Sequence, residues 1–382
     1  MRTFDCLIIG GGMCGLWTAY FLGESGLEVA LVERRTIGSG STGRSAGIVT
    51  TQLNLDDDVA LTRRSIELYR SLECDNDRPI YRETSFVTVE PEWMIRDSME
   101  VLRRNGVRFE VASCYDARTL LPYLRVKDYE SLLITPDDGV VNSENFVECA
   151  RSLLKELGVT IIEWDTVSSI EVVDDSVVGA RLKNSGITLK IRQDLILTAG
   201  PWNKQLLKEL NLTRMPTTVY TCQLLSLRGE FSSANAPCYF TEDHLYVRPL
   251  SRDTIVIGNG LARIVEDPDG VPVRPEPEYV WEVASKFEKR CATTDKVKVG
   301  GGWVGVCSSS PDGRPILGRS PFLENVYIID GLDGYGLMRA PALAEVLSSM
   351  ILGRPTEIDP TCYHPARFDV DREYGDRVIE LY

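Results

Sequence analysis

Several kinds of chemistry are excluded by what this chain lacks. It has only 2 histidines in 382 residues, and its 10 cysteines include no Cys-x-x-Cys pair, so we expect no metal site. Acidic residues outnumber basic ones, and the formal net charge is −14. Nucleic acids bind clustered Lys and Arg, so a nucleic-acid partner is not expected. No uninterrupted apolar stretch reaches ~18 residues, so we expect no membrane span.

The cysteines and the N-terminal segment bear on location. Cysteines scattered without a spacing pattern are typical of reduced, buried thiols in a cytoplasmic protein. The first apolar run contains Asp5, and a charge at that point is not typical of an export signal. We therefore predict reduced thiols and a cytoplasmic location, at most peripheral to a membrane. Arg outnumbers Lys, which also suits a thermophilic source, and internal disulfides are the alternative in that case.

Length and composition are those of a globular protein. The chain is 43% apolar and 26% charged, and its length suits about two domains. Strand-like and helix-like patterns alternate, which predicts an α/β fold, α+β overall. We expect helices at 55–72, 91–104, 143–157, 201–210, 280–290 and 341–351. We expect strands at 80–90, 159–163, 167–173, 177–182, 187–191, 194–198 and 326–330, and several more within 216–260.

A glycine-rich turn near the N-terminus is the strongest single motif. The apolar run 4–9 leads into Gly10-x-Gly12-x-x-Gly15, a helical pattern follows, and a second apolar run ends in Glu33. In this arrangement Gly10 permits a tight turn, Gly12 lets the backbone approach a pyrophosphate, and Gly15 lets the helix pack close to the strand. The helix N-terminus attracts phosphate, and the acid accepts hydrogen bonds from a ribose. The motif predicts a bound adenine dinucleotide.

Two more glycine-containing turns follow apolar runs later in the chain, at 199–200 and 331–336. In a doubly wound sheet, turns of this kind lie at the carboxyl ends of the strands, where ligands bind. Turns that are far apart in sequence are therefore expected to line one extended cofactor.

Further blocks resemble a known family. They are Gly38–Gly47, Asp138–Asn142, Leu197–Trp202, Tyr246–Pro249, Trp303–Gly305, Pro311–Gly318, Gly331–Met338 with Ala340–Ala342, and Arg367-Phe368. Together with the N-terminal motif, they make the chain similar, from Phe4 to about Phe368, to the D-amino-acid-oxidase/glycine-oxidase/sarcosine-oxidase family of FAD-dependent oxidoreductases. An enzyme that uses only NAD would not need the later blocks, so the resemblance favours FAD.

The resemblance implies a discontinuous, doubly wound Rossmann-type FAD-binding domain (1–80, 140–215 and 300–365). It implies a β-sheet-based substrate domain (81–139 and 216–299) and a C-terminal tail (366–382), with the flavin at the junction of the two domains. The residues expected to bind FAD are Gly10, Gly12, Met13, Cys14, Gly15, Glu33, Arg34, Gly40, Ser41, Thr42, Arg44, Ser45, Ala46, Gly47, Val167, Ala199, Gly200, Trp202, Gly305, Gly331, Asp333, Gly334, Tyr335, Gly336, Leu337 and Met338.

Departures from the family pattern bear on the reaction. Cys307 stands where glycine-oxidase-like members carry the arginine that holds the substrate carboxylate, and a thiol cannot replace a guanidinium. Gly305 stands at the cysteine that links flavin covalently in sarcosine-oxidase-like members, so we expect non-covalent FAD. Val256 aligns with the lysine linked to oxygen activation, which favours a dehydrogenase over an oxidase.

Two other departures lie in the flavin segment, where Asp333 and Tyr335 replace the usual serine and histidine. Arg248 and Arg339 are the remaining candidates for binding a carboxylate. Cys307 is a candidate reactive thiol, although a plain packed thiol is the simpler interpretation.

The reaction that the resemblance implies is oxidation of an amino acid or secondary amine by hydride transfer to flavin N5, followed by hydrolysis of the imine. A deprotonated amine needs no strong base, which suits a chain with few histidines. Tyr246 is our candidate for orienting the small-molecule substrate. Oxygen, a quinone or a carrier protein would accept the electrons.

Two other functions stay open. One is a dehydrogenase of a 2-hydroxy acid or polyol phosphate, and the other is an FAD-carrying electron-relay subunit of a larger complex. A homo- or hetero-oligomer is compatible with each of these functions.

Overall fold

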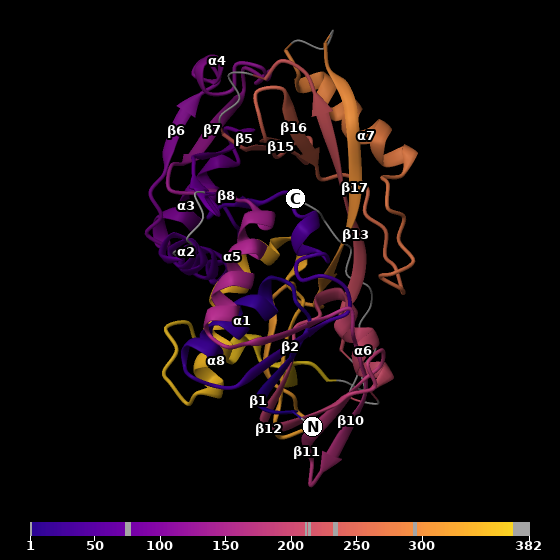
Figure 1. Ribbon diagram of the computed structural model, residues 1–382. Helices are drawn as coiled ribbons and strands as arrows, with labels where there is room; N and C mark the ends of the chain where they lie inside the picture. Colours follow the sequence, from indigo (N-terminus) through magenta and orange to yellow (C-terminus); the bar gives the residue numbers. More distant parts are fainter. Residues whose placement is uncertain are drawn as a thin grey trace.

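The protein, represented by a computed structural model, is built on two large sheets that lie at opposite ends of the molecule (Figure 1). The structure describes residues 2–72, 78–210, 212, 215–231, 236–292 and 296–369. Each large sheet has 8 strands. A third sheet of 3 short strands is formed by segments within residues 48–141. The predicted α/β class, α+β overall, is confirmed.

The first sheet contains the N-terminal strand and has a parallel centre. Its central strands lie in the order β9-β2-β1-β12-β19, and every neighbouring pair among them is parallel. Antiparallel strands extend it at β10-β11 and at β18. The strands are β1 (Arg2–Ile9), β2 (Val29–Glu33), β9 (Thr160–Glu163), β10 (Val167–Val173), β11 (Ser176–Leu182), β12 (Thr188–Leu197), β18 (Ile316–Arg319) and β19 (Val326–Asp330).

Both faces of this sheet are buried, which explains why its central strands are continuous apolar runs. Side chains such as Ile8 and Leu31 pack with helices α1, α2, α5 and α8 on one face. Leu7 and Val32 pack with α6 and with β10 and β11 on the other. The helices are α1 (Met13–Glu24), α2 (Asp56–Ser71), α5 (Ser143–Glu156), α6 (Asn203–Glu209) and α8 (Gly336–Ile351).

The second sheet has the order β17-β13-β16-β15-β14-β5-β7-β6. Its strands are β5 (Phe86–Pro91), β6 (Glu110–Ser113), β7 (Glu130–Thr135), β13 (Thr218–Arg228), β14 (Cys238–Phe240), β15 (Leu245–Pro249), β16 (Thr254–Gly258) and β17 (Lys298–Ser309). Helix α7 (Pro277–Arg290) packs on β13, β15 and β16, and α3 (Ile95–Arg104) packs on β7. Short helix α4 spans Ala117–Leu120. The paired strands β13 and β17 are the longest, and Figure 1 shows them descending towards the first sheet.

The third sheet is small and has the order β3-β8-β4, with β3 (Ile48–Val49), β4 (Tyr81–Glu83) and β8 (Gly139–Val141). The buried Asp138 holds it to the loop before α2. Its carboxylate accepts hydrogen bonds from the Thr50 hydroxyl (2.6 Å) and from the Thr51 amide (3.0 Å) and hydroxyl (2.8 Å). Burial raises the pKa of Asp138 to about 6.

Several element boundaries differ from the sequence-based prediction. The single strand expected at 80–90 is two strands, β4 and β5, which belong to different sheets. The two strands expected at 187–191 and 194–198 are one continuous strand, β12, because its first half pairs with β1 and β11 and its second half with β1 and β19. The helix expected from Pro91 begins at Ile95, because Pro91 still pairs within β5.

Helix α8 begins before the expected residue. It starts at Gly336, so that Pro341 lies inside it rather than at its start. A proline cannot donate to the carbonyl four residues earlier. The carbonyl oxygen left free, that of Leu337, accepts a hydrogen bond from the Tyr69 hydroxyl at 2.9 Å. A side chain from α2 therefore satisfies the group that the proline exposes.

The favoured expectation of reduced thiols does not hold for Cys149, whereas the alternative of an internal disulfide does. Cys149 on α5 is disulfide-bonded. Scattered spacing does not reveal such a bond, because pairing depends on which strands and helices meet in space. The proposed C-terminal tail lies largely outside the described residues, which end at 369.

Candidate functional site

Four strands of the first sheet end at the same edge, and three of them are followed by the expected glycine-containing turns. β1 leads into Gly10, β2 ends at Glu33, β12 leads into Thr198–Gly200, and β19 leads into Gly331. The parallel pairing places these ends side by side. The arrangement is the ligand-binding edge of a doubly wound sheet.

The N-terminal glycines have the conformations that a phosphate-binding turn requires. Gly10 has φ +111°, a value that L-residues rarely adopt. A Cβ atom at Gly15 would lie 1.9 Å from the carbonyl oxygen of Gly10, so only glycine fits at this helix–strand contact. The Met13 amide donates to the Thr42 hydroxyl at 2.9 Å. The next amides in the first turn of α1 have no intrahelical acceptor and can bind phosphate oxygens.

Glu33 is held rigidly at the end of β2. Its Oε2 accepts a hydrogen bond from the Gly11 amide at 2.8 Å, and its Oε1 accepts one from the Arg35 amide at 2.9 Å. A carboxylate has about four acceptor positions, so lone pairs stay free for a ribose diol. This geometry is compatible with the predicted role of Glu33 at the adenosine end of the site.

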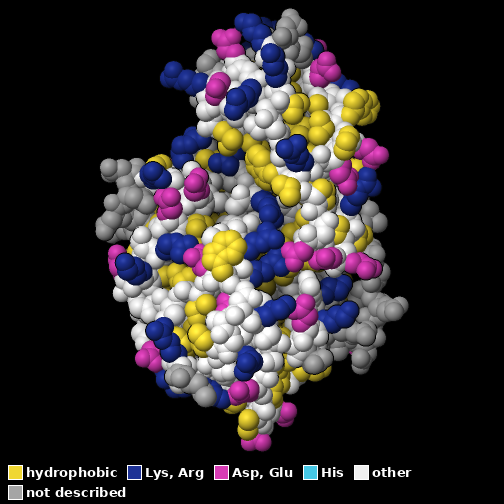
Figure 2. All heavy atoms as spheres, turned by 45° about the vertical axis from the view of Figure 1, so that its right-hand side comes forward, with side chains coloured by type: hydrophobic (Ala, Val, Ile, Leu, Met, Phe, Trp, Pro, Cys, Tyr) yellow, Lys and Arg dark blue, Asp and Glu magenta, His cyan; other side chains and the backbone are white. Residues whose placement is uncertain are grey.

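Arginine side chains gather beside this end. Arg34 forms an ion pair with Asp269 and lies 4.5 Å from the centre of the Trp202 ring. The Trp202 indole N–H donates to the same aspartate at 3.0 Å. Burial, with Arg35 and Arg34 nearby, lowers the pKa of Arg44. Figure 2 shows Lys and Arg side chains gathered across the middle of one face of this acidic protein.

One cavity of about 850 Å³ connects the turns of the first sheet with the face of the second. It runs from Glu33 past Gly12 and Gly200 to the turn after β19. A Cβ atom at Gly334 or Gly336 would meet nothing within 4 Å. An elongated dinucleotide fits this shape, with a glycine-lined cradle at its phosphate end and another at its far end.

Most of the residues expected to bind the cofactor line this cavity. The exceptions are Gly15, Gly47, Val167 and Gly331. Gly15 acts through packing, as described above. Val167 is buried at the start of β10, whereas Asp165 and Thr166 before it reach the cavity.

The far end of the cavity contains a polar cluster on β13 and β17. The sulfur atoms of Cys222 and Cys307 are 2.8 Å apart. Asp333 accepts a hydrogen bond from the Tyr220 hydroxyl and another from the Ser309 hydroxyl at 3.2 Å. Asp333 has φ +58°, so the turn after β19 carries a non-glycine residue in the left-handed region.

Sequence reasoning missed Tyr220, Cys222 and Ser309, because nothing in a strand pattern marks which residues oppose Cys307. The position of Cys307 relative to Trp303 indicates that Cys307 lies near the site. The sequence does not indicate which residues of the neighbouring strand lie beside it, because the strand register is not visible in the sequence.

Tyr246 and the two candidate arginines have different surroundings. Tyr246 on β15 lines the cavity, and its hydroxyl makes no hydrogen bond with a described residue. The guanidinium of Arg248 donates to the carbonyl oxygens of Ala46 and Val141 and is not part of the cavity wall.

Arg339 is buried, with 1% of its surface exposed. It donates from Nε and Nη2 to the two carboxylate oxygens of Asp58, both at 2.7 Å, and from Nη1 to the Leu332 carbonyl at 3.0 Å. Because its donors are engaged on both sides, Arg339 joins α8 to the start of α2.

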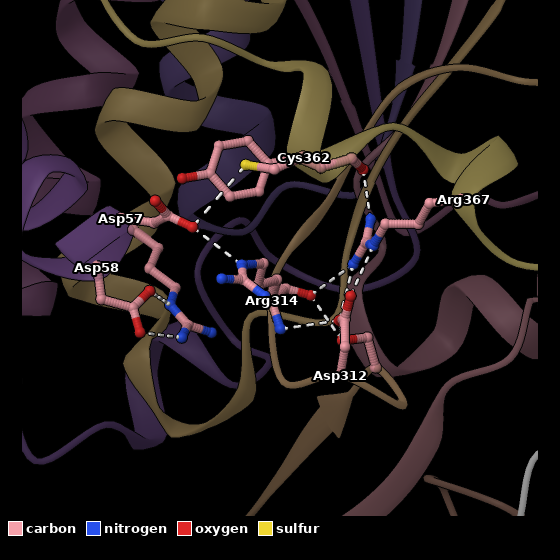
Figure 3. A network of polar contacts seen from close by, with 9 residues as sticks. Asp57, Asp58, Asp312, Arg314, Cys362 and Arg367 are labelled. Atoms are coloured by element: carbon pink, nitrogen blue, oxygen red, sulfur yellow. Dashed lines mark hydrogen bonds and ion pairs between the residues drawn. The ribbon is translucent and has the colours of Figure 1, made fainter. Parts of the chain in front are cut away.

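The acidic start of α2 belongs to a wider network shown in Figure 3. Asp57 accepts a hydrogen bond from Arg314 Nε at 2.9 Å, and Asp312 accepts hydrogen bonds from Arg367. Asp312 also accepts a hydrogen bond from the backbone amide of Arg314 at 3.0 Å. The blocks at 311–318 and 367–368, which resemble family motifs, therefore fasten α2 and the C-terminal segment around the cavity.

The class of protein follows from this architecture and from the family match. Residues 5–350 match the DAO family, described as FAD dependent oxidoreductase. The chain therefore belongs to this family, and it is an FAD-dependent oxidoreductase of the amino-acid and amine type.

Individual relatives are distant but span nearly the full length. A glycine oxidase of Bacillus licheniformis is 23% identical, covering 94% of this chain and 95% of its own. A monomeric sarcosine oxidase of Bacillus sp. (strain NS-129) is 23% identical, covering 97% and 98%. The fold is also that of L-proline dehydrogenase from P. horikoshii, with TM-score 0.87 and 23% identity over 96% of this chain and 98% of that one.

No helix within the described ranges combines the length and apolar character needed to cross a bilayer.

Proposed function

We propose that the protein is a dehydrogenase that oxidises the C–N bond of an amino acid or secondary amine. When bound, FAD supplies the acceptor for the two electrons, by hydride transfer from the carbon next to nitrogen to flavin N5. The chain binds the cofactor without a covalent bond, orients the substrate and excludes water. Water then hydrolyses the imine product.

The observation that carries this proposal is the character of the far end of the cavity. Among the described residues, it presents the Tyr246 hydroxyl, for which no hydrogen-bond partner is found, and the neighbouring thiols of Cys222 and Cys307. Burial raises the pKa of Tyr246, so its hydroxyl stays protonated and can donate to the substrate. An amine that binds deprotonated needs no base, whereas an alcohol does.

None of the three described positions predicted for binding a substrate carboxylate offers a free guanidinium. Cys307 occupies the position of the family arginine, Arg339 is engaged by Asp58, and Arg248 donates to backbone carbonyls. This favours a secondary amine, or an amino acid held through its nitrogen, over a simple amino acid held through its carboxylate.

Two observations support a dehydrogenase over an oxidase. Val256, at the position of the oxygen-linked lysine, is buried within β16. Among the described residues that line the cavity, the lysine present is Lys183, at the adenosine end with Asp165 and Thr166. The ring end therefore lacks the ammonium group that would stabilise reduced oxygen.

A second candidate function is oxidation of a 2-hydroxy acid or a polyol phosphate, which would require a base. His244 lines the cavity, and its Nδ1 lies 3.2 Å from the Tyr239 hydroxyl. It is the histidine that would serve as that base.

A third candidate is an electron-relay subunit of a larger assembly. A sarcosine oxidase subunit beta of Rhizobium meliloti (strain 1021) is 25% identical over 89% of this chain. That likeness supports a hetero-oligomer. In such an assembly, a carrier protein or a quinone would accept the electrons.

We also propose the domain boundaries given above and a cytoplasmic location.

Anaerobic mixing of the yellow holoenzyme with panels of secondary amines, amino acids, hydroxy acids and polyol phosphates tests the proposal. We expect rapid bleaching of flavin absorbance by one or more amines, and slow reoxidation by air compared with a quinone. Bleaching by hydroxy acids alone would transfer the assignment to the second candidate. No bleaching by any compound would favour the relay subunit.

A further inference from the structure

The two cysteines at the far end of the cavity come from neighbouring strands. In the β13–β17 pairing, Cys222 lies opposite Gly305 and Tyr220 lies opposite Cys307, so the two thiols are diagonal neighbours on one face. Their sulfur atoms are 2.8 Å apart, and both residues are half-buried and line the cavity. A disulfide has sulfur atoms about 2.05 Å apart, so bond formation needs a movement of less than ~1 Å.

The pair lies at the end of the cavity that the flavin ring must occupy. Glu33 and the first turn of α1 mark the adenosine and phosphate portions of a bound dinucleotide. The remaining portion extends away from Glu33, towards the wall formed by β13, β17 and the turn after β19. The Ser41 hydroxyl donates to the Val306 carbonyl at 2.6 Å, which holds β17 against the phosphate-binding loop.

Tyr220 and Asp333 are polar groups beside the pair. The contact with Cys307 and burial raise the pKa of the Cys222 thiol, whereas the Tyr220 hydroxyl lowers it. Tyr220, which is fully buried, donates in turn to Asp333. Tyr220 lies two residues from Cys222 on β13 and opposite Cys307 on β17, so its hydrogen bond to Asp333 begins beside the two thiols.

We propose that Cys222 and Cys307 form a redox-active pair that exchanges two electrons with the bound flavin. In the oxidising direction, two S–H bonds break and one S–S bond forms. FAD gains two electrons and one proton to become FADH⁻, and the second proton passes through Tyr220 to Asp333. In the reverse direction, FADH⁻ and one proton reduce the disulfide to two thiols and regenerate FAD.

The exchange gives the protein a store for one electron pair beside the flavin. Substrate oxidation reduces the flavin, and electron transfer to the disulfide reoxidises it. The flavin can then accept a second electron pair from the substrate. The inference rests on FAD binding, which the family establishes, and does not depend on which substrate is oxidised.

Anaerobic titration of the holoenzyme with dithionite measures the capacity directly. We expect the wild-type protein, oxidised beforehand, to consume about four electrons per flavin before excess reductant appears, because a disulfide accepts two. Cys222→Ser and Cys307→Ser should each consume about two fewer. Cys362→Ser is the matched control, since Cys362 is exposed and outside the cavity, and it should behave as wild type.

Peptide mapping after alkylation provides a second measurement on the unaltered protein. The peptides containing Cys222 and Cys307 should be disulfide-linked before titration and alkylated after it, which separates this pair from the disulfide of Cys149. This mapping decides the matter even if a serine variant fails to fold.

The proposal is overturned if both peptides are already alkylated in the oxidised protein, or if the serine variants keep the wild-type electron count. Because dithionite replaces the substrate, either result is independent of the amine-bleaching experiment.

Discussion

The two ends of the cavity are built in different ways. The proposed adenosine end is formed by backbone amides, glycines and one carboxylate, and all of them fall within residues 10–46. At the far end, side chains from β13, β15, β17 and the turn after β19 meet, although more than 100 residues separate the first from the last. The first end is built from one contiguous segment, whereas the second depends on how distant strands pair.

This difference leads us to expect that the two ends tolerate substitutions differently. Backbone geometry at the adenosine end permits few residue types, since a methyl group at Gly15 already collides with Gly10. Strand positions at the far end accept many side chains without altering the sheet, so reaction chemistry can diverge there while the cofactor site is maintained. Cys307, which the family resemblance aligns with an arginine, would be one such divergence.

The largest effect is expected from Gly15→Val, which tests the contiguous segment at the adenosine end. The new side chain would place its Cβ 1.9 Å from the Gly10 carbonyl oxygen, so α1 must move away from β1. We expect loss of bound FAD, measured by flavin absorbance per mole of purified protein. Gly270→Ala is the control, because the nearest atom to its Cβ is 3.5 Å away in the 266–278 loop. If Gly15→Val is purified with full flavin content, the close contact of α1 with β1 is not required for FAD binding, and the contrast between the two ends fails.

A second large effect is expected from Arg339→Ala, which probes the junction between the ends. The substitution leaves the buried carboxylate of Asp58 unpaired, and breaking such a pair costs about 3–5 kcal/mol of unfolding free energy. Chemical denaturation measures the loss, and Arg339→Ala combined with Asp58→Ala should recover part of it. An unchanged Michaelis constant is expected, because the guanidinium is engaged by Asp58. A large rise in that constant at normal stability would instead assign Arg339 to the substrate.

Glu33→Ala should weaken FAD binding without unfolding the protein. The variant loses the ribose acceptor and two hydrogen bonds to backbone amides, and hydrogen bonds to a charged group contribute about 1.5–3 kcal/mol each. We expect affinity to fall roughly 10- to 100-fold, a free-energy change of about 1.4–2.7 kcal/mol, measured by equilibrium dialysis. Glu156→Ala, on the exposed end of α5, is the matched control. Unchanged affinity in Glu33→Ala would remove this residue from the ribose site.

The smallest structural effect is expected from Tyr246→Phe, which changes the far end by one oxygen atom. Flavin content and stability should equal those of wild type, because the hydroxyl has no described protein partner. The rate of flavin reduction by the best amine should fall about 10-fold, the loss of one hydrogen bond of about 1.4 kcal/mol. Stopped-flow absorbance measures it. Equal rates in both proteins would show that Tyr246 only packs against the substrate.

The fold and the local structure from β1 to Glu33 were predictable for the same physical reason. The strand, turn, helix and acid between residues 2 and 33 are contiguous, so spacing alone indicates their geometry, and the structure confirms it. Family membership and FAD dependence, which the resemblance implied, are also confirmed.

Features that depend on long-range pairing were not predictable. The split of 80–90 into β4 and β5, the contact of Cys222 with Cys307 and the disulfide of Cys149 each require knowing which segments meet. The early start of α8 was missed because the Tyr69 hydroxyl, from a distant helix, satisfies the carbonyl that Pro341 leaves free.

The bridge formed by Arg34, Asp269 and Trp202 has a consequence for cofactor turnover. It ties the loop that precedes α7 to the adenosine end of the first domain, along the wall of the cavity. Its charged groups are about one-third exposed, and such an ion pair contributes about 0–1 kcal/mol and is screened by salt. Ionic strength should therefore govern how fast one FAD molecule exchanges for another, while the melting temperature of the holoenzyme hardly changes.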